Sequence, residues 1–406
     1  MSIVPDGWGH ATVRDVCLPV SKVDPASLNR SHFQYVDIGS IETGAMAVSS
    51  PQVIAVQDAP SRARQLVAVG DTVFSTVRPY LKKIAWISEN LDGEIASTGF
   101  CVLRPNREHV DPRFLFHYAA SDGLLNQVLP LQRGVSYPAV RDGDVLSAKV
   151  PVPPLDEQRR IVALLEYHLS RLEAAMASIQ AVVRLSTRLV DAQRRLLLYP
   201  EGVRTVPIAT VASVVNGSTP KGIADATVAV GGPGRIPYIK VGDMNSGDGI
   251  HVVSSRTWLR EEDARRLGMR VAPAGTVIFP KRGGAIATNK KRVLARAAAF
   301  DLNTMGVIPG TDLEPAFLRM YFESVDLTSI ADGSNIPQIN AKGMARLRVP
   351  VLDLAAQREA VASLEGIEAA VTRYATAPTM DLASRLRRSL LRAAFSGQLT
   401  KESVSV

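Results

Sequence analysis

One uninterrupted stretch, residues 155–199, constrains the fold more than any other feature, because it contains no Gly and no Pro. Its wealth of Leu, Arg, Glu, Ala and Gln favours a single helix over any other structure. At about 1.5 Å per residue, such a helix would be roughly 67 Å long. A helix of this length exceeds an ordinary globular domain, so we expect it to require a partner helix.

Apolar residues in this stretch recur at steps of three and four residues or multiples of them, which is the period of a coiled coil. A second long helix is predicted to begin near Leu354, and Pro378 is expected to kink or break it. The residues predicted to pair the two helices are Ile161, Leu165, Leu172, Ile179, Val182, Leu189, Leu196, Val361, Leu364 and Val371.

The two halves of the chain resemble one another in the same order, about 200 residues apart. The matching segments are Tyr35–Gly39 with Tyr238–Gly242, Thr72–Arg78 with Thr276–Arg282, Asp111–Leu115 with Glu314–Leu318, and Gln158–Arg159 with Gln357–Arg358. They predict, in turn, an alternating strand, a buried strand that ends in a basic residue, a helix with Pro in its first turn, and the head of a long helix. Gly134, Pro138 and Pro151 also recur, with the same spacing among them, as Gly333, Pro337 and Pro350.

The repeat predicts a mixed α/β fold in which two duplicated globular domains are joined by two long helices. The expected limits are 1–154 and 200–353 for the domains, with the helices at 155–199 and 354–400. Because each helix leaves its domain in the same sense, a chain with pseudo-twofold symmetry would pair the helices as an antiparallel coiled coil.

The charge of the chain points to a polyanionic partner, although only weakly by itself. The formal net charge is +8 and the sequence pI is near 9.6. Residues 1–200 hold 21 Lys and Arg against 20 Asp and Glu, which leaves 26 against 19 for the rest of the chain. Between Asp263 and Asp301 there are nine basic residues and no acidic one.

These basic segments are candidates for contacts with double-stranded DNA, whose phosphates bind Lys and Arg while polar side chains contact base edges. The candidates in the second domain are Lys240, Lys281, Arg282, Asn289, Lys290, Lys291, Arg292, Arg296 and Gln338. Those in the first domain are Arg62, Arg64, Arg78, Lys82, Lys83 and Arg133. Both groups can also be interpreted as solvated charged loops, and the loops 134–138 and 333–337 as structural turns.

The sequence lacks the motifs of phosphate-binding loops, methyltransferase loops and dinucleotide-binding turns, and its six His residues have no metal-ligand spacing. Cys17 and Cys101 are interpreted as buried thiols. The amino terminus has no signal-peptide pattern and no segment approaches about 18 apolar residues, so we expect a cytoplasmic protein without a membrane span.

Two motifs carry a resemblance to a known family. The segment Pro151–Arg159, Pro-Val-Pro-Pro-Leu-Asp-Glu-Gln-Arg, is similar to the junction motif of the specificity subunits of type I restriction-modification systems. The ending Leu391–Leu399 resembles their carboxy-terminal signature. The second junction, Pro350–Arg358, departs from the motif, but Asp353 can still cap the helix.

The resemblance implies two target-recognition domains, each followed by a spacer helix, that read a bipartite DNA target. It also implies a non-catalytic subunit within a type I site-specific deoxyribonuclease and adenine methyltransferase complex. Two methyltransferase subunits that use S-adenosylmethionine, and restriction subunits that use ATP and Mg, would dock on this chain. The chain itself would bind no cofactor and no metal.

Two other functions remain open from the residues alone. The chain could be a free-standing homodimeric DNA-binding regulator or architectural protein, with the helical face used for self-association. It could instead be a protein-interaction scaffold, which predicts no salt-dependent DNA binding.

Overall fold

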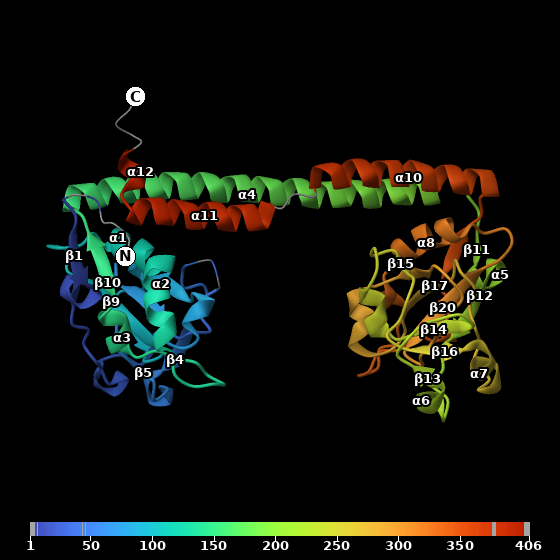
Figure 1. Cartoon of the computed structure of the whole chain (residues 1–406), viewed down its shortest axis with the longest axis horizontal. Coiled ribbons are helices and arrows are strands. Elements are labelled where there is room, and N and C mark those ends of the chain that lie inside the picture. The colour runs from blue at the N-terminus through green and yellow to red at the C-terminus, as the bar shows by residue number, and fades with distance from the viewer. Residues whose placement is uncertain (1–4, 6, 43, 45, 376–378, 402–406) are drawn as a thin grey trace. The chain divides into compact units, whose positions relative to one another are not determined.

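The computed structural model describes residues 5, 7–42, 44, 46–375 and 379–401. It forms two compact units, of which unit 1 comprises Met1–Ile179 and Ala377–Val406, and unit 2 comprises Gln180–Thr376. The stretch predicted as one long helix is α4, Leu155–Leu198, which contributes residues to both units (Figure 1). The kink predicted near Pro378 lies outside the described residues.

The strands described for unit 1 form two sheets and a short pair (Figure 1). One sheet is antiparallel, with the order β2 (Cys17–Leu18), β9 (Phe100–Pro105), β6 (Thr72–Ser75) and β7 (Ile84–Trp86). The other has the order β4 (Gln52–Ala55), β3 (His32–Val36), β8 (Ile95–Ser97) and β5 (Ala63–Leu66), with β3 and β8 parallel. The pair joins β1 (Gly9–Thr12) to β10 (Lys149–Val152), the strand that leads into α4.

Three short helices complete the globular part of unit 1. They are α1 (Pro112–Ala119), α2 (Asp122–Val128) and α3 (Asp142–Leu146). Helix α1 begins as predicted, with Pro112 in its first turn and the Asp111 carboxylate accepting the N–H groups of Arg113 and Phe114. Buried side chains of α1 and the β6–β9 sheet share one core with Ile161 and Leu165 of α4.

Unit 2 repeats this plan with different strand lengths. Its larger sheet has the order β12 (Ala212–Asn216), β20 (Thr304–Pro309), β17 (Val277–Pro280), β18 (Arg292–Leu294) and β15 (His251–Val252). Its smaller sheet has the order β13 (Thr227–Val228), β16 (Trp258–Arg260), β14 (Arg235–Ile239) and β19 (Ala299–Phe300). A short pair again joins the first strand, β11 (Thr205–Pro207), to the last, β21 (Arg348–Pro350).

The short helices described for unit 2 correspond only in part to those of unit 1. They are α5 (Ile208–Val211), α6 (Ile223–Ala226), α7 (Glu261–Arg266), α8 (Pro315–Glu323) and α9 (Ala341–Met344). The counterpart of α1 is α8, which again begins with Pro and packs its buried Phe317 and Leu318 in one core with Leu198 of α4. The remaining helices of the chain are α10 (Leu354–Ala375), α11 (Thr379–Phe395) and α12 (Gln398–Lys401).

A buried glutamine ties the start of α4 to unit 1. Gln158 is 0% exposed, and its amide oxygen accepts the backbone N–H of Asp111, at the start of α1, at 2.7 Å. Its amide nitrogen donates to the carbonyl oxygens of His109 at 3.0 Å and Pro153 at 2.8 Å. One side chain therefore joins the head of α4 to the head of α1 and to the strand before α4.

The second junction uses the same device, although its motif is less complete. Gln357 is 1% exposed, and its oxygen accepts the backbone N–H of Glu314 at 2.8 Å. Its nitrogen donates to the carbonyl oxygens of Asp312 at 2.9 Å and Leu352 at 2.8 Å. The Asp353 carboxylate accepts the N–H of Ala356 at 2.8 Å and so caps α10.

Within unit 1, α11 runs antiparallel beside α4, and the short α12 lies near the start of α4 (Figure 1). Arg160 of α4 donates to the carbonyl oxygen of Thr400, whereas Glu173 lies 3.9 Å from Arg387. Moving forward along α4 therefore moves the contact backward along the partner. Within unit 2, α10 runs beside the last part of α4, where Arg194 lies 3.0 Å from Glu368 (Figure 1).

The pairing residues predicted for the first half of α4 face the core of unit 1 or its margin. Ile161 and Leu165 are 1% and 0% exposed, and Leu172 and Ile179 are half-buried. In α10, Leu364 is 1% exposed, while Val361 and Val371 are half-buried against the core of unit 2.

The prediction is wrong for the second half of α4. Val182, Leu189 and Leu196 are 53%, 52% and 64% exposed, whereas Val190 and Leu198 are buried. The predicted positions assume a coiled-coil period of 3.5, but an undistorted helix has 3.6 residues per turn and drifts by about 20° per heptad. Over about five heptads from Ile161 the drift reaches about 100°, so the buried face lies one residue further along.

The mixed α/β class, the duplicated globular parts and the paired long helices are confirmed. The domain limits of 1–154 and 200–353 stay a prediction, since division by contacts assigns part of α4 to each unit.

We expect Gln158→Ala to lower the free energy of unfolding of unit 1 by about 3 kcal/mol, because it leaves buried N–H and C=O groups without partners. The control is Arg159→Ala, which removes only an exposed ion pair with Asp156 and should cost under about 1 kcal/mol. Urea unfolding of the full chain measures both. Equal effects of the two variants would show that the glutamine contacts contribute no special stability.

Candidate nucleic-acid interface

A loop closes onto the end of strand β6 in unit 1. After β6 the chain passes through Thr76 and Arg78 into a short 3₁₀ helix, η4 (Pro79–Leu81). The N–H of Arg78 donates to the carbonyl oxygen of Pro138 at 2.7 Å, and the N–H of Val140 donates to Thr76 at 2.9 Å. The loop 132–139 is thereby attached to the basic end of the strand.

Unit 2 contains the same construction after strand β17. The N–H of Gly283 donates to the carbonyl oxygen of Pro337 at 2.8 Å, and the N–H of Ile339 donates to Lys281 at 2.9 Å. The loop 331–338 therefore corresponds to the loop 132–139. These bonds correct the sequence alignment by one residue, because Arg78 occupies the place of Gly283 and not that of Arg282.

Both units hold left-handed backbone at the start of the 3₁₀ helix or just before it, and again just after its end. In unit 1 these positions are Arg78, with φ of 47°, and Lys82, with φ of 51°. In unit 2 they are Gly283, with φ of 71°, and Asn289, with φ of 51°, around η8 (Gly283–Thr288). A left-handed residue other than Gly costs about 1–2 kcal/mol. Unit 1 thus keeps two basic side chains at strained positions where unit 2 has residues that tolerate this backbone.

Most of the basic candidates of unit 1 are paired within the protein. Lys82 lies 2.7 Å from Asp122, and the Lys83 ammonium donates to the carbonyl oxygens of Ile38 and Ile41. Arg64 lies 3.3 Å from Asp24. The Lys83 amine holds the loop after β3, which differs from the predicted contact with DNA.

Arg133 and Arg78 hold the loop 132–139. Arg62, the remaining candidate of unit 1, is exposed. Arg133 lies 2.7 Å from Asp144, and its hydrogen bond lowers the pKa of that carboxyl. The Arg78 guanidinium donates to the carbonyl oxygen of Ser136 at 3.2 Å and lies 5.1 Å from the ring centroid of Tyr137. Arg78 therefore supports this loop and remains at the surface.

In unit 2 the predicted cluster divides into side chains that bond within the protein and side chains that do not. The Lys291 ammonium donates to the carbonyl oxygen of Val325 at 2.6 Å and to Asn289 at 2.8 Å, and burial lowers its pKa to about 8. The Asn289 carbonyl also accepts the N–H of Leu327 at 2.9 Å. Lys291 and Asn289 are thus structural partners, which corrects the prediction that Lys291 is a DNA contact. Arg282, by contrast, is exposed and its side chain makes no ion pair with another described residue.

The other candidates of unit 2 have local partners or lie at the surface. Lys281 donates to Asn216 at 2.9 Å and burial lowers its pKa, while Lys290 donates to Asn245. The Arg296 guanidinium lies 5.5 Å from the ring centroid of Trp258. The remaining three are Lys240, which is exposed, Arg292, which donates to the carbonyl oxygen of Lys291, and Gln338, whose backbone pairs with Asp332.

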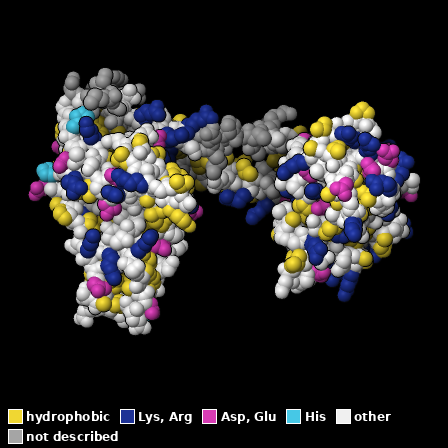
Figure 2. Space-filling model, turned by 60° about the horizontal axis from the view of Figure 1, so that its bottom comes forward, with side chains coloured by type: hydrophobic (Ala, Val, Ile, Leu, Met, Phe, Trp, Pro, Cys, Tyr) yellow, Lys and Arg dark blue, Asp and Glu magenta, His cyan; other side chains and the backbone are white. Residues whose placement is uncertain are grey.

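Charge alone does not mark a single patch on these units. Figure 2 shows Lys and Arg spread over the visible face of each unit, with Asp and Glu among them. What the two units share is the loop attached to the end of β6 or β17. Sequence reasoning treated these loops as turns and missed their exposed residues Tyr137 and Ile336, although both directly precede a repeated Pro.

No group of three or more His, Cys, Asp or Glu side chains that could hold a metal ion is found in the described part of the chain. Cys101 is buried and Cys17 partly so, and burial raises the pKa of both thiols. None of the helices among the described residues is long and apolar enough to cross a membrane.

Comparison with known proteins agrees with this construction. The family described as "Type I restriction modification DNA specificity domain" matches residues 5–182. The HsdS subunit from Thermoanaerobacter tengcongensis is 32% identical with a TM-score of 0.58, over 97% of this chain and 98% of that chain. The chain belongs to the family of type I restriction-modification specificity subunits.

Other relatives of this specificity subunit agree with the assignment. A chain from a study of complex assembly and conformational transition of the type I R-M system is 31% identical, with a TM-score of 0.76, over 97% of this chain and 99% of that chain. The HindI specificity subunit of Haemophilus influenzae is 27% identical over 27% of this chain, and the EcoDI subunit of Escherichia coli is 24% identical over 40%. These last two matches span only 24% and 35% of the relatives' own length.

The half-buried Lys291 predicts a dependence of stability on pH. Its folded pKa of about 8 lies below the ordinary 10.5, so between these values the folded chain binds fewer protons than the unfolded chain. The free energy of unfolding should therefore rise with pH through this window. Lys291→Met should lack this rise, so the stability of the wild type relative to the variant should grow between about pH 8 and pH 10. A constant difference in urea unfolding would show that Lys291 is not desolvated.

Proposed function

We propose that the chain is the non-catalytic DNA-recognition subunit of a type I complex and that each unit reads one half of a bipartite, asymmetric target in the major groove. The two long helices would set the unspecified gap between the half-sites. The chemistry would belong to partner subunits, two methyltransferase subunits with S-adenosylmethionine and restriction subunits with ATP and Mg, acting in the cytoplasm.

One observation carries this proposal: the same backbone construction occurs once in each unit with different side chains on it. Arg78 in unit 1 corresponds to Gly283 in unit 2, Lys82 corresponds to Asn289, and Tyr137 corresponds to Ile336. Equal backbones can approach DNA in the same way, while unequal side chains select different bases. This is what recognition of an asymmetric two-part site requires.

Salt dependence tests the DNA-binding part of the proposal. Arg282→Ala removes an exposed guanidinium, so it should weaken binding of the full chain with its methyltransferase subunit and lower the slope of log affinity against log salt by about 0.9 if one phosphate contact is lost. The control is Lys291→Met. Because the Lys291 amine already bonds to a carbonyl oxygen within the protein, this variant should leave the salt slope unchanged. Binding without any salt dependence in the wild type would favour the scaffold function instead.

The face of α4 that was predicted to pair with a second helix offers a place for a partner. Along the last part of α4 an apolar stripe recurs at steps of three and four residues and is exposed within unit 2. Its members are Val182, Leu185, Leu189, Ala192, Leu196 and Tyr199. The period is that of a coiled-coil seam without its partner.

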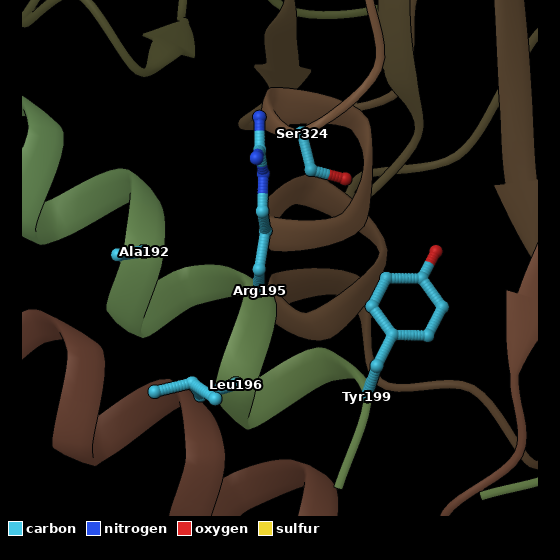
Figure 3. Close-up of a pocket in the computed structure, with 5 residues that line it drawn as sticks. All are labelled: Ala192, Arg195, Leu196, Tyr199 and Ser324. Atoms are coloured by element: carbon cyan, nitrogen blue, oxygen red, sulfur yellow. The ribbon is translucent and has the colours of Figure 1, made fainter.

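The stripe ends at an open hollow of about 530 Å³ beside the last turn of α8. Figure 3 shows Arg195 extending from α4, and Tyr199 from the residue just after α4, beside the helix that leads to Ser324, with Leu196 pointing away from them. We propose that an amphipathic helix of a methyltransferase subunit docks on this stripe, because such contiguous exposed apolar surface is typical of an interface.

Leu189→Asp should abolish co-purification of the methyltransferase subunit, because it places a charge in the middle of the stripe, while the fold and DNA binding persist. The control is Arg188→Asp, which introduces the same side chain at the adjacent residue outside the stripe and should leave the complex intact. Equal recovery of the complex with both variants would exclude the stripe as the docking surface.

The stripe also supports the second candidate, a free-standing homodimeric regulator, because a second copy of the chain could cover it. Sedimentation of the isolated chain distinguishes the two. The regulator would be a dimer that Leu189→Asp converts to a monomer.

A further inference from the structure

The two attached loops each present an apolar side chain to solvent at the same position. Tyr137 is 73% exposed and directly precedes Pro138, and Ile336 is 57% exposed and directly precedes Pro337. The carbonyl oxygen of Pro138 accepts the backbone N–H of Arg78, just after β6. The carbonyl oxygen of Pro337 accepts the backbone N–H of Gly283, just after β17. The two side chains therefore have equivalent places relative to the basic end of β6 or β17.

In unit 1 the loop is held by backbone pairing and by Arg78. Arg133 and Ala139 exchange two backbone hydrogen bonds at 2.8 and 2.9 Å, which closes the loop. Gly134 has φ of 91°, and an added Cβ would lie 3.0 Å from the carbonyl oxygen of Tyr137. The Arg78 guanidinium lies over the Tyr137 ring, so one face of the ring is supported while most of the side chain remains open.

In unit 2 a different set of bonds holds the equivalent loop. The Asp332 carboxylate accepts the N–H of Gln338 at 2.9 Å and the hydroxyl of Ser334 at 2.7 Å. The Ser334 hydroxyl also lies 2.7 Å from the carbonyl oxygen of Ile336, and the N–H of Asp332 donates to Gln338. Ile336 is thus exposed on an ordered loop.

A single exposed apolar residue is ordinary and needs no explanation. Here the same position is apolar and exposed in both units, although unrelated side chains hold the two loops in place. In unit 1 the Arg78 guanidinium lies over the Tyr137 ring, and in unit 2 Arg282 pairs through its backbone with Gln338, two residues after Ile336. An apolar tip beside a cation matches a ligand that combines phosphates with base faces, as DNA does.

We propose that Tyr137 and Ile336 are wedge residues, each placed against the face of a base at one step of its own half-site and partly unstacking that step. This inference rests on the proposed function and adds to it the residues that contact base faces. Tyr137 offers a ring supported by Arg78, and Ile336 offers a smaller aliphatic wedge, so the two half-sites would be deformed to different extents.

The test uses the full chain assembled with its methyltransferase subunit and duplexes that carry its methylated motif. The fluorescent adenine analogue 2-aminopurine is placed at successive positions of each half-site, because its emission rises when it is unstacked. Binding of the wild type should raise the emission at one step in each half-site. Tyr137→Ala should abolish the rise in one half-site and Ile336→Ala in the other, and each should lose about tenfold or more in affinity.

Three further results separate base contact from loop stability. Tyr137→Phe keeps the ring and should bind as the wild type does. Val135→Ser, which changes the 100% exposed neighbour to the residue found at the same place in unit 2, should also have no effect. The salt slope should stay unchanged in Tyr137→Ala, because no phosphate contact is lost.

Wild-type affinity and unchanged emission in both alanine variants would overturn the inference while leaving the proposed function intact. Failure of the wild-type complex to bind its motif selectively would overturn the proposed function, and the inference with it.

Discussion

The buried amide of Gln158, repeated at Gln357, is the contact on which the architecture depends. Each amide accepts one backbone N–H at the head of a domain helix and donates to two carbonyl oxygens on either side of the junction. A carboxylate could not donate, and an apolar residue would leave three buried polar groups unpaired. The direction in which a long helix leaves its domain is therefore set by one side chain. Because the device is repeated, both helices leave their domains in the same way, which is what antiparallel pairing requires.

The structure separates the basic residues that bond within the protein from those that remain free. Lys83 and Lys291 point inward to carbonyl oxygens, and Arg133 is paired with Asp144. These cations order the loops that surround the attached segments, whereas Arg282 stays available. The strained backbone at Arg78 and Lys82 fits the same view, since unfavourable backbone persists mainly where a side chain has to be presented in one direction.

Features with a strong local cause could be predicted from the sequence. The absence of Gly and Pro predicted the extent of α4, the repeated Pro predicted the starts of α1 and α8, and the repeat itself predicted duplicated α/β units. Features set by small accumulated differences could not be predicted. The buried face of α4 moved from Leu189 to Val190 because a tenth of a residue per turn accumulates over the four heptads from Ile161. The one-residue shift that makes Arg78 the counterpart of Gly283 depends on backbone bonds to a distant loop. The inward direction of the Lys291 side chain depends on the carbonyl oxygen of Val325, in the turn after α8.

The central claim is that each unit reads its own half of the target. It is tested most directly by exchanging residues 204–350 for the corresponding segment of another member of the family, and mapping the methylated motif of the chimera in cells by sequencing. Strands β11 and β21, at the two ends of this segment, pair with each other, and Gln357, which attaches α10 to the segment, lies outside it. The chimera should therefore fold. We predict a motif in which one half is new, while the other half and the gap are those of the parent. A motif changed in both halves would contradict the claim.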